Sequence, residues 1–412
     1  MTAGRSRTPL AVAGALTVAE LAVVLLRPRS GVVEPLPVSA RTYFSQPELD
    51  RARRFRRPQL ALLAAGLAVE AGVLAALVRR PPRRLRQAAP GSLPSTALAG
   101  TLLSLGLELA TLPLSALARR RSIREGLATD TWARWAGDRA KSSAIGAAFA
   151  GGGAALTVGL MDRSRRHWWL PASAGAVLTA TGLSYAGPLL LDPLFNRFTV
   201  LPQGRLRDDV LALARRAGVD VGEVFEVDAS RRTTAANAYV TGLGPTKRVV
   251  LYDTLLEHFD ADETLLVVAH ELAHVRHRDV ARGLLLLALT APASAYAVAR
   301  LTERLGDGRP GPATVPALTL ALAIVTAPVG VISLQLSRRV EARADWFALQ
   351  ATGTPEAGIS FEQRITIRNL ADPDPPGWLA ALLGTHPSTV QRIGIAKAYQ
   401  RDRDAGQVTQ AG

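Results

Sequence analysis

The chain has 412 residues, a formal charge of +15 and no cysteine, and 48% of its residues are hydrophobic although only 5% are aromatic. This composition excludes a disordered or collagen-like chain, and the lack of cysteine excludes a fold built on disulfides. Any metal site must therefore use His, Asp or Glu. The basic charge is typical of nucleic-acid-binding proteins, but in so hydrophobic a chain it more often belongs to loops facing anionic lipid and the cytoplasm.

The apolar residues gather into seven blocks, each about as long as the ~20 residues that cross a ~30 Å hydrocarbon layer. The first block resembles a signal peptide, but Arg27, Pro28 and Arg29 follow it in place of a small-residue cleavage site. We therefore predict a mainly α, polytopic membrane protein with about seven transmembrane helices. The blocks lie at 9–26, 60–78, 95–118, 142–162, 168–191, 281–301 and 312–336.

Polar segments divide these blocks into regions. A membrane region with five helices is predicted at 1–191, a first catalytic segment at 192–280, two further membrane helices at 281–336, a second catalytic segment at 337–404, and a disordered tail at 405–412. In the first catalytic segment we expect helices at 203–217 and 261–279 and short strands at Val224–Val227 and Arg248–Tyr252.

The distribution of charge predicts the orientation in the membrane. If the N-terminus is outside, the inward-facing loops hold 15 Lys and Arg and the outward-facing segments hold 12. This weak bias favours a cell-membrane protein whose two catalytic segments face the cytoplasm. Two spans separate those segments, so they share one side of the membrane in either orientation.

The local pattern with most chemical content is His270-Glu271-Leu272-Ala273-His274. On a helix, residues four apart lie on the same face, so the two imidazoles can bind one Zn²⁺ while Glu271 lies beside them as a general base. Chance is a poor explanation, because the composition gives this pattern only about 0.003 times per chain. A degenerate copy without metal remains the alternative.

A zinc protease needs a third protein ligand. His277 lies about 10 Å along the helix from His270, too far to share one ion with it, and His386 is distant in sequence. Glu341 and Asp345 are four residues apart, so one carboxylate can bind the metal while the other orients a ligating His. The alternative is a solvated patch of these acids with neighbouring arginines.

Taken together, these motifs resemble the integral-membrane CAAX prenyl endopeptidases, which are zinc metalloproteases. The resemblance rests on His270–His274 continued to Asp279, on Glu341–Asp345, and on the segments 237–240, 247–256 and 385–388 with Arg392. It implies a barrel-like bundle of seven membrane helices around a chamber, a helical zinc-protease core and a small β edge element. It also implies one Zn²⁺ per chain, held by His270, His274 and Glu341, with Asp345 behind them.

The resemblance assigns further residues. Glu271 and His386 are expected to be catalytic, His386 as a stabiliser of the oxyanion, and Asn237 and Arg392 are expected to bind substrate. The alternatives are a turn for Asn237, a surface position for His386, and pairing with acids of the site or a solvated charge for Arg392. Asp279 is expected to end the zinc helix in a structural role, either as a helix-end contact or as a partner behind one of the zinc ligands.

The expected partners are the lipid bilayer and a peptide or membrane-protein substrate, with no nucleic acid. The predicted function is metal-dependent endopeptidase activity in membrane-protein quality control or peptide processing. Two alternatives remain. One is a catalytically inactive membrane scaffold, and the other is a transporter that uses the carboxylates predicted to lie inside spans, Glu20, Glu70 and Glu108.

Overall fold

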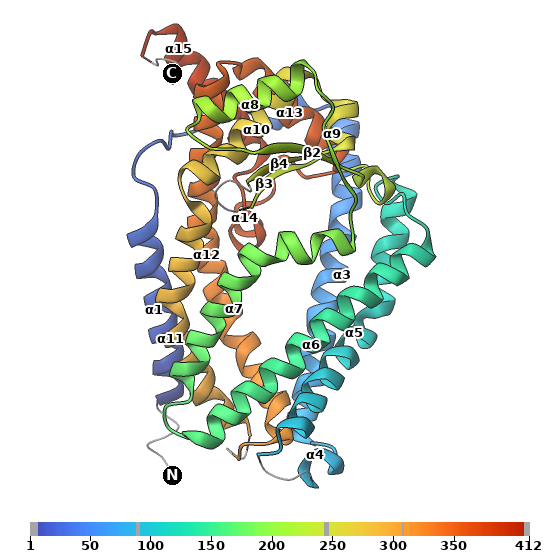
Figure 1. Cartoon of the computed structure of the whole chain (residues 1–412), viewed down its shortest axis with the longest axis vertical. Helices are drawn as coiled ribbons and strands as arrows, with labels where there is room; N and C mark the ends of the chain where they lie inside the picture. The colour runs from blue at the N-terminus through green and yellow to red at the C-terminus, as the bar shows by residue number, and fades with distance from the viewer. Residues whose placement is uncertain (1–6, 88–90, 243–246, 307–308, 408–412) are drawn as a thin grey trace.

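The protein consists of a bundle of long helices with a small head at one end (Figure 1). The computed structural model describes residues 7–87, 91–242, 247–306 and 309–407. The first helix begins at Arg7 at the far end of the bundle, and the last helix lies in the head. The first helix therefore enters the bundle from the side opposite the head.

Each of the seven predicted apolar blocks falls on one long helix, which confirms the mainly α, polytopic fold. Among the described residues, six of these helices are long and apolar enough to cross a membrane. The exception is α7, whose Gly, Ser, Thr and Pro residues dilute its hydropathy, although it packs along α11. The helices are α1 (Arg7–Leu26), α3 (Gln46–Arg79), α5 (Leu93–Arg124), α6 (Trp132–Arg163), α7 (Trp169–Leu190), α11 (Asp279–Leu305) and α12 (Val315–Thr352).

One helix, α12, joins the membrane bundle to the head. Its 38 residues correspond to a length of about 57 Å, and a hydrocarbon layer takes up only ~30 Å of this. The last turns of α12 therefore extend into the head. The boundary predicted between residues 336 and 337 lies inside this helix, because the sequence becomes polar there without losing its helical pattern.

The head contains a four-stranded sheet in the order β1-β2-β4-β3. The central pair β2–β4 is parallel, and β1 and β3 pair antiparallel on the outside. Two of the strands, β2 and β4, coincide with the predicted ones, and the edge strand β3 confirms the small β element. The strands are β1 (Phe198–Val200), β2 (Glu223–Val227), β3 (Ala238–Thr241) and β4 (Arg248–Tyr252).

Helices cover this sheet and share one apolar core with it. The most buried helix is α10, in which Val268, Leu272 and Ala273 are fully buried. It begins at Asp260 and Glu263, which cap each other's backbone N–H groups. The helices of the head are α8 (Arg205–Arg216), α9 (Asp253–His258), α10 (Ala261–Arg276), α13 (Pro355–Arg368), α14 (Gly377–Leu383) and α15 (Thr389–Asp404); short helical turns lie at α2 (Ala40–Tyr43), α4 (Arg83–Gln87), η1 (Asp192–Leu194), η2 (Ala229–Arg231) and η4 (Pro312–Thr314).

The ends of two predicted segments differ from expectation. The helix expected at 261–279 ends at Arg276, and Asp279 instead begins α11. Arg278 has a left-handed backbone, with φ of 54°, and this breaks the helix between the two. Of the predicted tail, residues 405–407 follow α15 in a turn, and 408–412 lie outside the described residues.

Helices α5, α6, α7, α11 and α12 line a partly open cavity of about 710 Å³. Its walls are mostly apolar, with hydroxyl groups such as those of Thr290, Ser294 and Ser333. None of the three carboxylates predicted inside spans lines this cavity. Glu20 accepts a hydrogen bond from Gln335, and Glu108 pairs with Arg139 at 2.6 Å.

Close packing of α5 on α6 depends on Gly100. A Cβ atom at this position would lie 2.7 Å from the carbonyl oxygen of Ala150 and 2.8 Å from the Cβ of Ala154. Small residues of this kind allow membrane helices to approach closely. In contrast, a Cβ atom at Gly106 on the same helix would have no atom of a neighbouring helix or loop within 4 Å.

We therefore expect Gly100→Ala to destabilise the protein by about 1–3 kcal/mol, because the added methyl group overpacks the contact. Gly106→Ala should be neutral or stabilising by up to ~1 kcal/mol, since alanine favours a helix. Thermal unfolding of both variants in the same detergent tests this. Equal melting temperatures would show that the close approach of the two helices does not matter for stability.

Candidate active site

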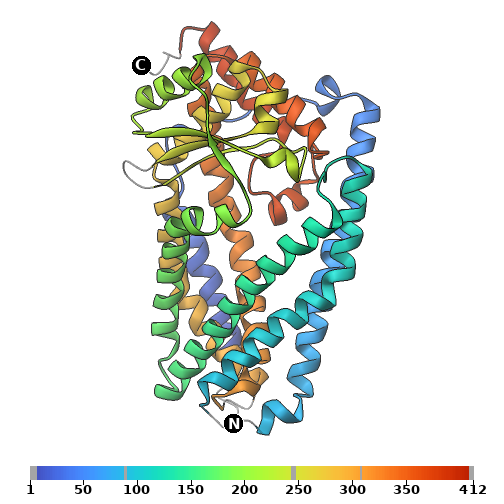
Figure 2. The ribbon, with the colours of Figure 1, turned by 45° about the vertical axis from the view of Figure 1, so that its right-hand side comes forward.

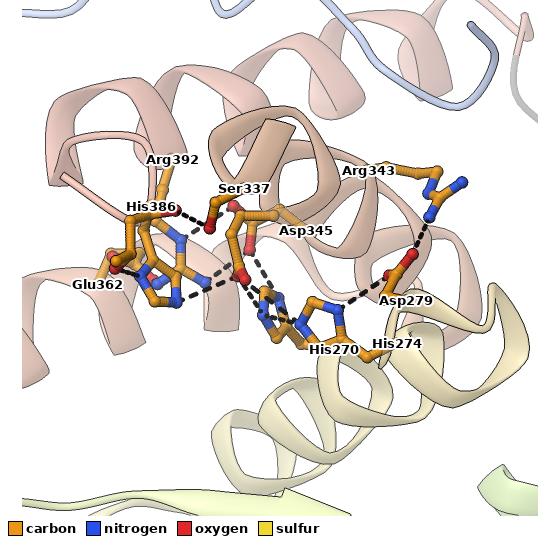
Figure 3. Close-up of polar contacts among 11 residues, drawn as sticks. His270, His274, Asp279, Ser337, Arg343, Asp345, Glu362, His386 and Arg392 are labelled. Carbon is orange, nitrogen blue, oxygen red and sulfur yellow. Dashed lines mark hydrogen bonds and ion pairs between the residues drawn. The ribbon is translucent and has the colours of Figure 1, made fainter. Parts of the chain in front are cut away.

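His270 and His274 face each other on the buried side of α10. Their Nε2 atoms lie 3.2 Å apart (Figure 3). His270 is only 7% exposed, so its ring cannot reach bulk water. The spacing of one helical turn predicted this pairing, and the helix holds both rings on the same face.

A third donor atom comes from α12, which packs beside α10. Oε2 of Glu341 lies 3.1 Å from Nε2 of His270 and 3.7 Å from Nε2 of His274. Tetrahedral sites with ~2.0–2.1 Å bonds to zinc have donor atoms about 3.3 Å apart. The three donor atoms thus have the spacing that one such ion requires.

The outer nitrogen of each imidazole faces a carboxylate. Nδ1 of His270 lies 2.9 Å from Oδ1 of Asp345, and Nδ1 of His274 lies 3.1 Å from Oδ2 of Asp279. A carboxylate in this position favours the tautomer that carries the proton on Nδ1, which leaves the lone pair on Nε2. The lone pairs of both rings then face the Glu341 carboxylate, an arrangement that is repulsive unless a cation lies among them. These residues therefore fit a bound divalent metal ion.

The electrostatics of the site also favour positive charge. Burial by itself lowers the pKa of His270, but the adjacent carboxylates of Asp345 and Glu341 outweigh burial and raise this pKa to about 10. Without a metal ion the site therefore binds a proton.

Two arginines hold the carboxylates that face the imidazoles. Arg392 donates from Nε to Oδ2 of Asp345 over 2.9 Å, and its Nη1 pairs with Glu362 at 2.6 Å. Arg343 pairs in the same way with Asp279. Arg392 thus lies behind Asp345 and not among the groups that face the donor atoms (Figure 3). This position corresponds to the alternative in which Arg392 pairs with acidic residues of the site, and not to the predicted contact with substrate. Sequence reasoning did not identify Glu362, because a single glutamate on an ordinary helix carries no signal.

Glu271 and His386 both lie close to the donor atoms. Donor atoms of His270, Glu271 and His274 all lie within 4.8 Å of one another. Burial raises the pKa of Glu271, against the effect of the two histidines, which lower it. The side chain of His386 is 52% exposed, and its Nε2 lies 3.1 Å from Oε2 of Glu341. His386 is oriented by Thr385, whose hydroxyl lies 2.7 Å from its Nδ1.

Asn237 immediately precedes the edge strand β3 and is exposed. Its backbone carbonyl accepts from the N–H of Tyr252 and so begins the pairing with β4. Its Oδ1 accepts from the N–H of Ala238, while no partner is described for its side-chain N–H groups. The outer edge of β3 pairs with no other strand of this sheet.

The structure also decides between two sequence-based alternatives for the region around Glu341. Arg343 and Asp345 are buried, at 7% and 8% exposed, so these charges are not a solvated surface patch. His277 follows the end of α10 and stacks edge-on against Phe347, away from the donor atoms.

Comparison with known proteins places this chain among metallopeptidases. The model of peptidase family M48 matches residues 201–400. The chain is 33% identical over 305 residues to the uncharacterized metalloprotease YhfN of Bacillus subtilis, and the alignment covers 72% of each chain. It is 30% identical over 214 residues to the CAAX prenyl protease 1 homolog of Oryza sativa subsp. japonica, where half of each chain is aligned. The crystal structure of S. mikatae Ste24p shares the fold, with a TM-score of 0.74 and 20% identity over 94% of this chain and 98% of that one.

The contact between His274 and Asp279 generates a test of the metal site. Asp279→Asn keeps the shape of the side chain but removes its charge, and loss of such a partner typically lowers metal affinity about 10- to 100-fold. We expect a loss of this size in competition with a zinc-chelating dye. Asp262→Asn, at an exposed position in the first turn of α10, is the matched control. Equal affinities in the two variants would exclude a role of Asp279 in holding His274.

Proposed function

We propose that this chain, which belongs to peptidase family M48, hydrolyses peptide bonds with one zinc ion held by His270, His274 and Glu341. Membership of the family makes the protein a membrane-embedded metalloendopeptidase. The observation that carries the proposed ligand set is the convergence of two Nε2 atoms and one carboxylate oxygen within 3.7 Å. Zinc is favoured over harder cations, because imidazole nitrogens dominate the site.

When bound, the metal ion would lower the pKa of a water molecule and polarise the scissile carbonyl. The remaining steps fall to residues of the chain. Glu271 accepts a proton from the attacking water and later returns it to the leaving amine. A carboxylate pKa raised by burial is consistent with this exchange.

We assign to His386 the stabilisation of the oxyanion that develops when water attacks the carbonyl. Its half-exposed ring lies beside Glu341, so Nε2–H can donate to an oxygen of a substrate bound there. Asp345 and Arg392 do not touch the substrate in this mechanism. They hold His270 in the tautomer and orientation that leave its Nε2 free to bind metal.

The substrate would bind as an additional strand. Within the described residues, one edge of β3 pairs with no other strand, and an extended peptide can pair with such an edge through its backbone. Asn237, at the start of this strand, has exposed N–H groups that can bind a substrate carbonyl. Backbone pairing explains how one site could accept many sequences, as expected of a protease in membrane-protein quality control or peptide processing. The rice relative is named as a homolog of a CAAX prenyl protease. Peptides with prenylated CAAX-type C-termini are therefore a second substrate class to be tested.

The head faces the cytoplasm in this proposal, because the loops at the head end of the bundle hold more basic residues than those at the other end. Because the chain has no cysteine, Asp262→Cys would introduce a single thiol into the head. A membrane-impermeant maleimide should label it only after cells are opened. Labelling in intact cells would place the head outside.

The central test concerns the assignment of Glu271 as the general base. Glu271→Gln should lower kcat for peptide hydrolysis about 10²- to 10⁴-fold and leave the zinc content unchanged, because the amide cannot accept the proton and the ligands remain. Activity is measured on an unfolded membrane protein and on a prenylated peptide, with and without a chelator. The matched control is Glu257→Gln on α9, an exposed position outside the site.

The same assay separates the remaining alternatives. Near-normal hydrolysis by Glu271→Gln would exclude Glu271 as the base, and a wild-type protein that binds zinc but cleaves neither substrate would support an inactive scaffold. His386→Ala should lower kcat about 10²-fold at unchanged zinc content. Substrates that copurify with Glu271→Gln from native membranes, identified by mass spectrometry, would show which of the two substrate classes is physiological.

A further inference from the structure

The short helix α14 exposes apolar side chains beside the candidate active site. In a segment of seven residues, Trp378 is 66% exposed, Leu382 46% and Leu383 49%. Three residues after Leu383 the chain reaches His386. Apolar side chains gathered on one short element mark a surface that binds something.

Side chains of α12 fix α14 in place next to the donor atoms. Arg338 donates to the carbonyl oxygens of Ala380 and Gly384 at the end of α14, over 3.3 and 2.9 Å. Ser337 donates to the carbonyl of Thr385 over 2.8 Å. Ser337 lies one helical turn before Glu341, so α14 is held at the level of the site and is not a loose surface loop.

The face of α12 that holds α14 is directed towards the interior of the bundle. Thr326, Gly330 and Ser333 line the internal cavity, and Ser337 and Glu341 continue the same stripe at helical spacing. Along this stripe α14 thus lies between the cavity and the donor atoms. Figures 1 and 2 both show α14 below the head, on the side of the membrane helices. Contact with outer lipid is therefore not the explanation for its exposed side chains.

We propose that α14 is the apolar wall of the substrate-binding site and selects peptides with bulky apolar side chains next to the scissile bond, with Trp378, Leu382 and Leu383 as specificity-determining residues. This inference rests on the proposed peptidase activity. An extended substrate presents alternate side chains to opposite sides, so one set of them meets α14 while the backbone pairs elsewhere. Segments released from the membrane have this composition, and the cavity on the other side of α14 is apolar as well.

The test uses two quenched fluorescent peptides of equal length and charge, one rich in Leu and Phe and one with Ser and Asn in their place. The full-length protein in detergent should cleave the apolar peptide with the higher kcat/KM. Trp378→Ala and the double variant Leu382→Ser/Leu383→Ser should each lose roughly tenfold or more in kcat/KM for the apolar peptide. Their kcat/KM for the polar peptide should fall much less, and their zinc content should stay unchanged. Equal losses on both peptides, or none, would overturn the proposal.

A binding measurement separates this proposal from the peptidase activity. In the Glu271→Gln protein, Trp378 is replaced by the photo-crosslinking residue benzoylphenylalanine. The labelled apolar peptide should crosslink at this position, and unlabelled apolar peptide, but not polar peptide, should compete. If the peptide crosslinks but the wild-type protein hydrolyses no peptide, the peptidase activity is refuted and the role of α14 as an apolar wall is supported. If position 378 crosslinks only to detergent or lipid, or if the peptide is hydrolysed but does not crosslink, the role of α14 is refuted. The proposed peptidase activity is unaffected by this outcome.

Discussion

The structure depends on one electrostatic constraint, which is that three proton-acceptor atoms face one another in a space with little water. Nε2 of His270, Nε2 of His274 and Oε2 of Glu341 lie within 3.7 Å of each other. Lone pairs at this spacing repel unless a cation lies among them. The backbone of α10 sets the spacing of the two imidazoles, and the packing of α12 on α10 brings the carboxylate to them.

Burying so many charges requires that each has a partner, because an unpaired charge in a protein interior is costly. The pairs extend outward from the metal site, from His270 to Asp345, then to Arg392, and finally to Glu362. These four residues lie on α10, α12, α15 and α13. The ion pairs thus connect four helices of the head, so the geometry of the metal site and the packing of the head depend on each other.

The length of α12 connects this site with the membrane. Since one rigid helix carries Ser333 at the cavity, Ser337 under α14 and Glu341 among the donor atoms, a substrate reaching the site from the bundle would pass these groups in order. The cavity has mostly apolar walls, whereas the donor atoms are ringed by charges.

Local patterns in the sequence determined the apolar helices, strands β2 and β4, and the presence of a two-histidine motif with carboxylates four residues apart at Glu341 and Asp345. Such features depend on spacing along one helix or strand, which is a property of neighbouring residues. Only the tertiary structure decided the partners. It showed that Asp279 starts α11 and faces His274, that Glu362 holds Arg392, and that Arg392 lies behind Asp345. The contacts of Arg392 join residues far apart in the chain, and the contact of His274 with Asp279 crosses the break between α10 and α11. Their distances depend on how whole helices pack, which spacing in the sequence does not encode.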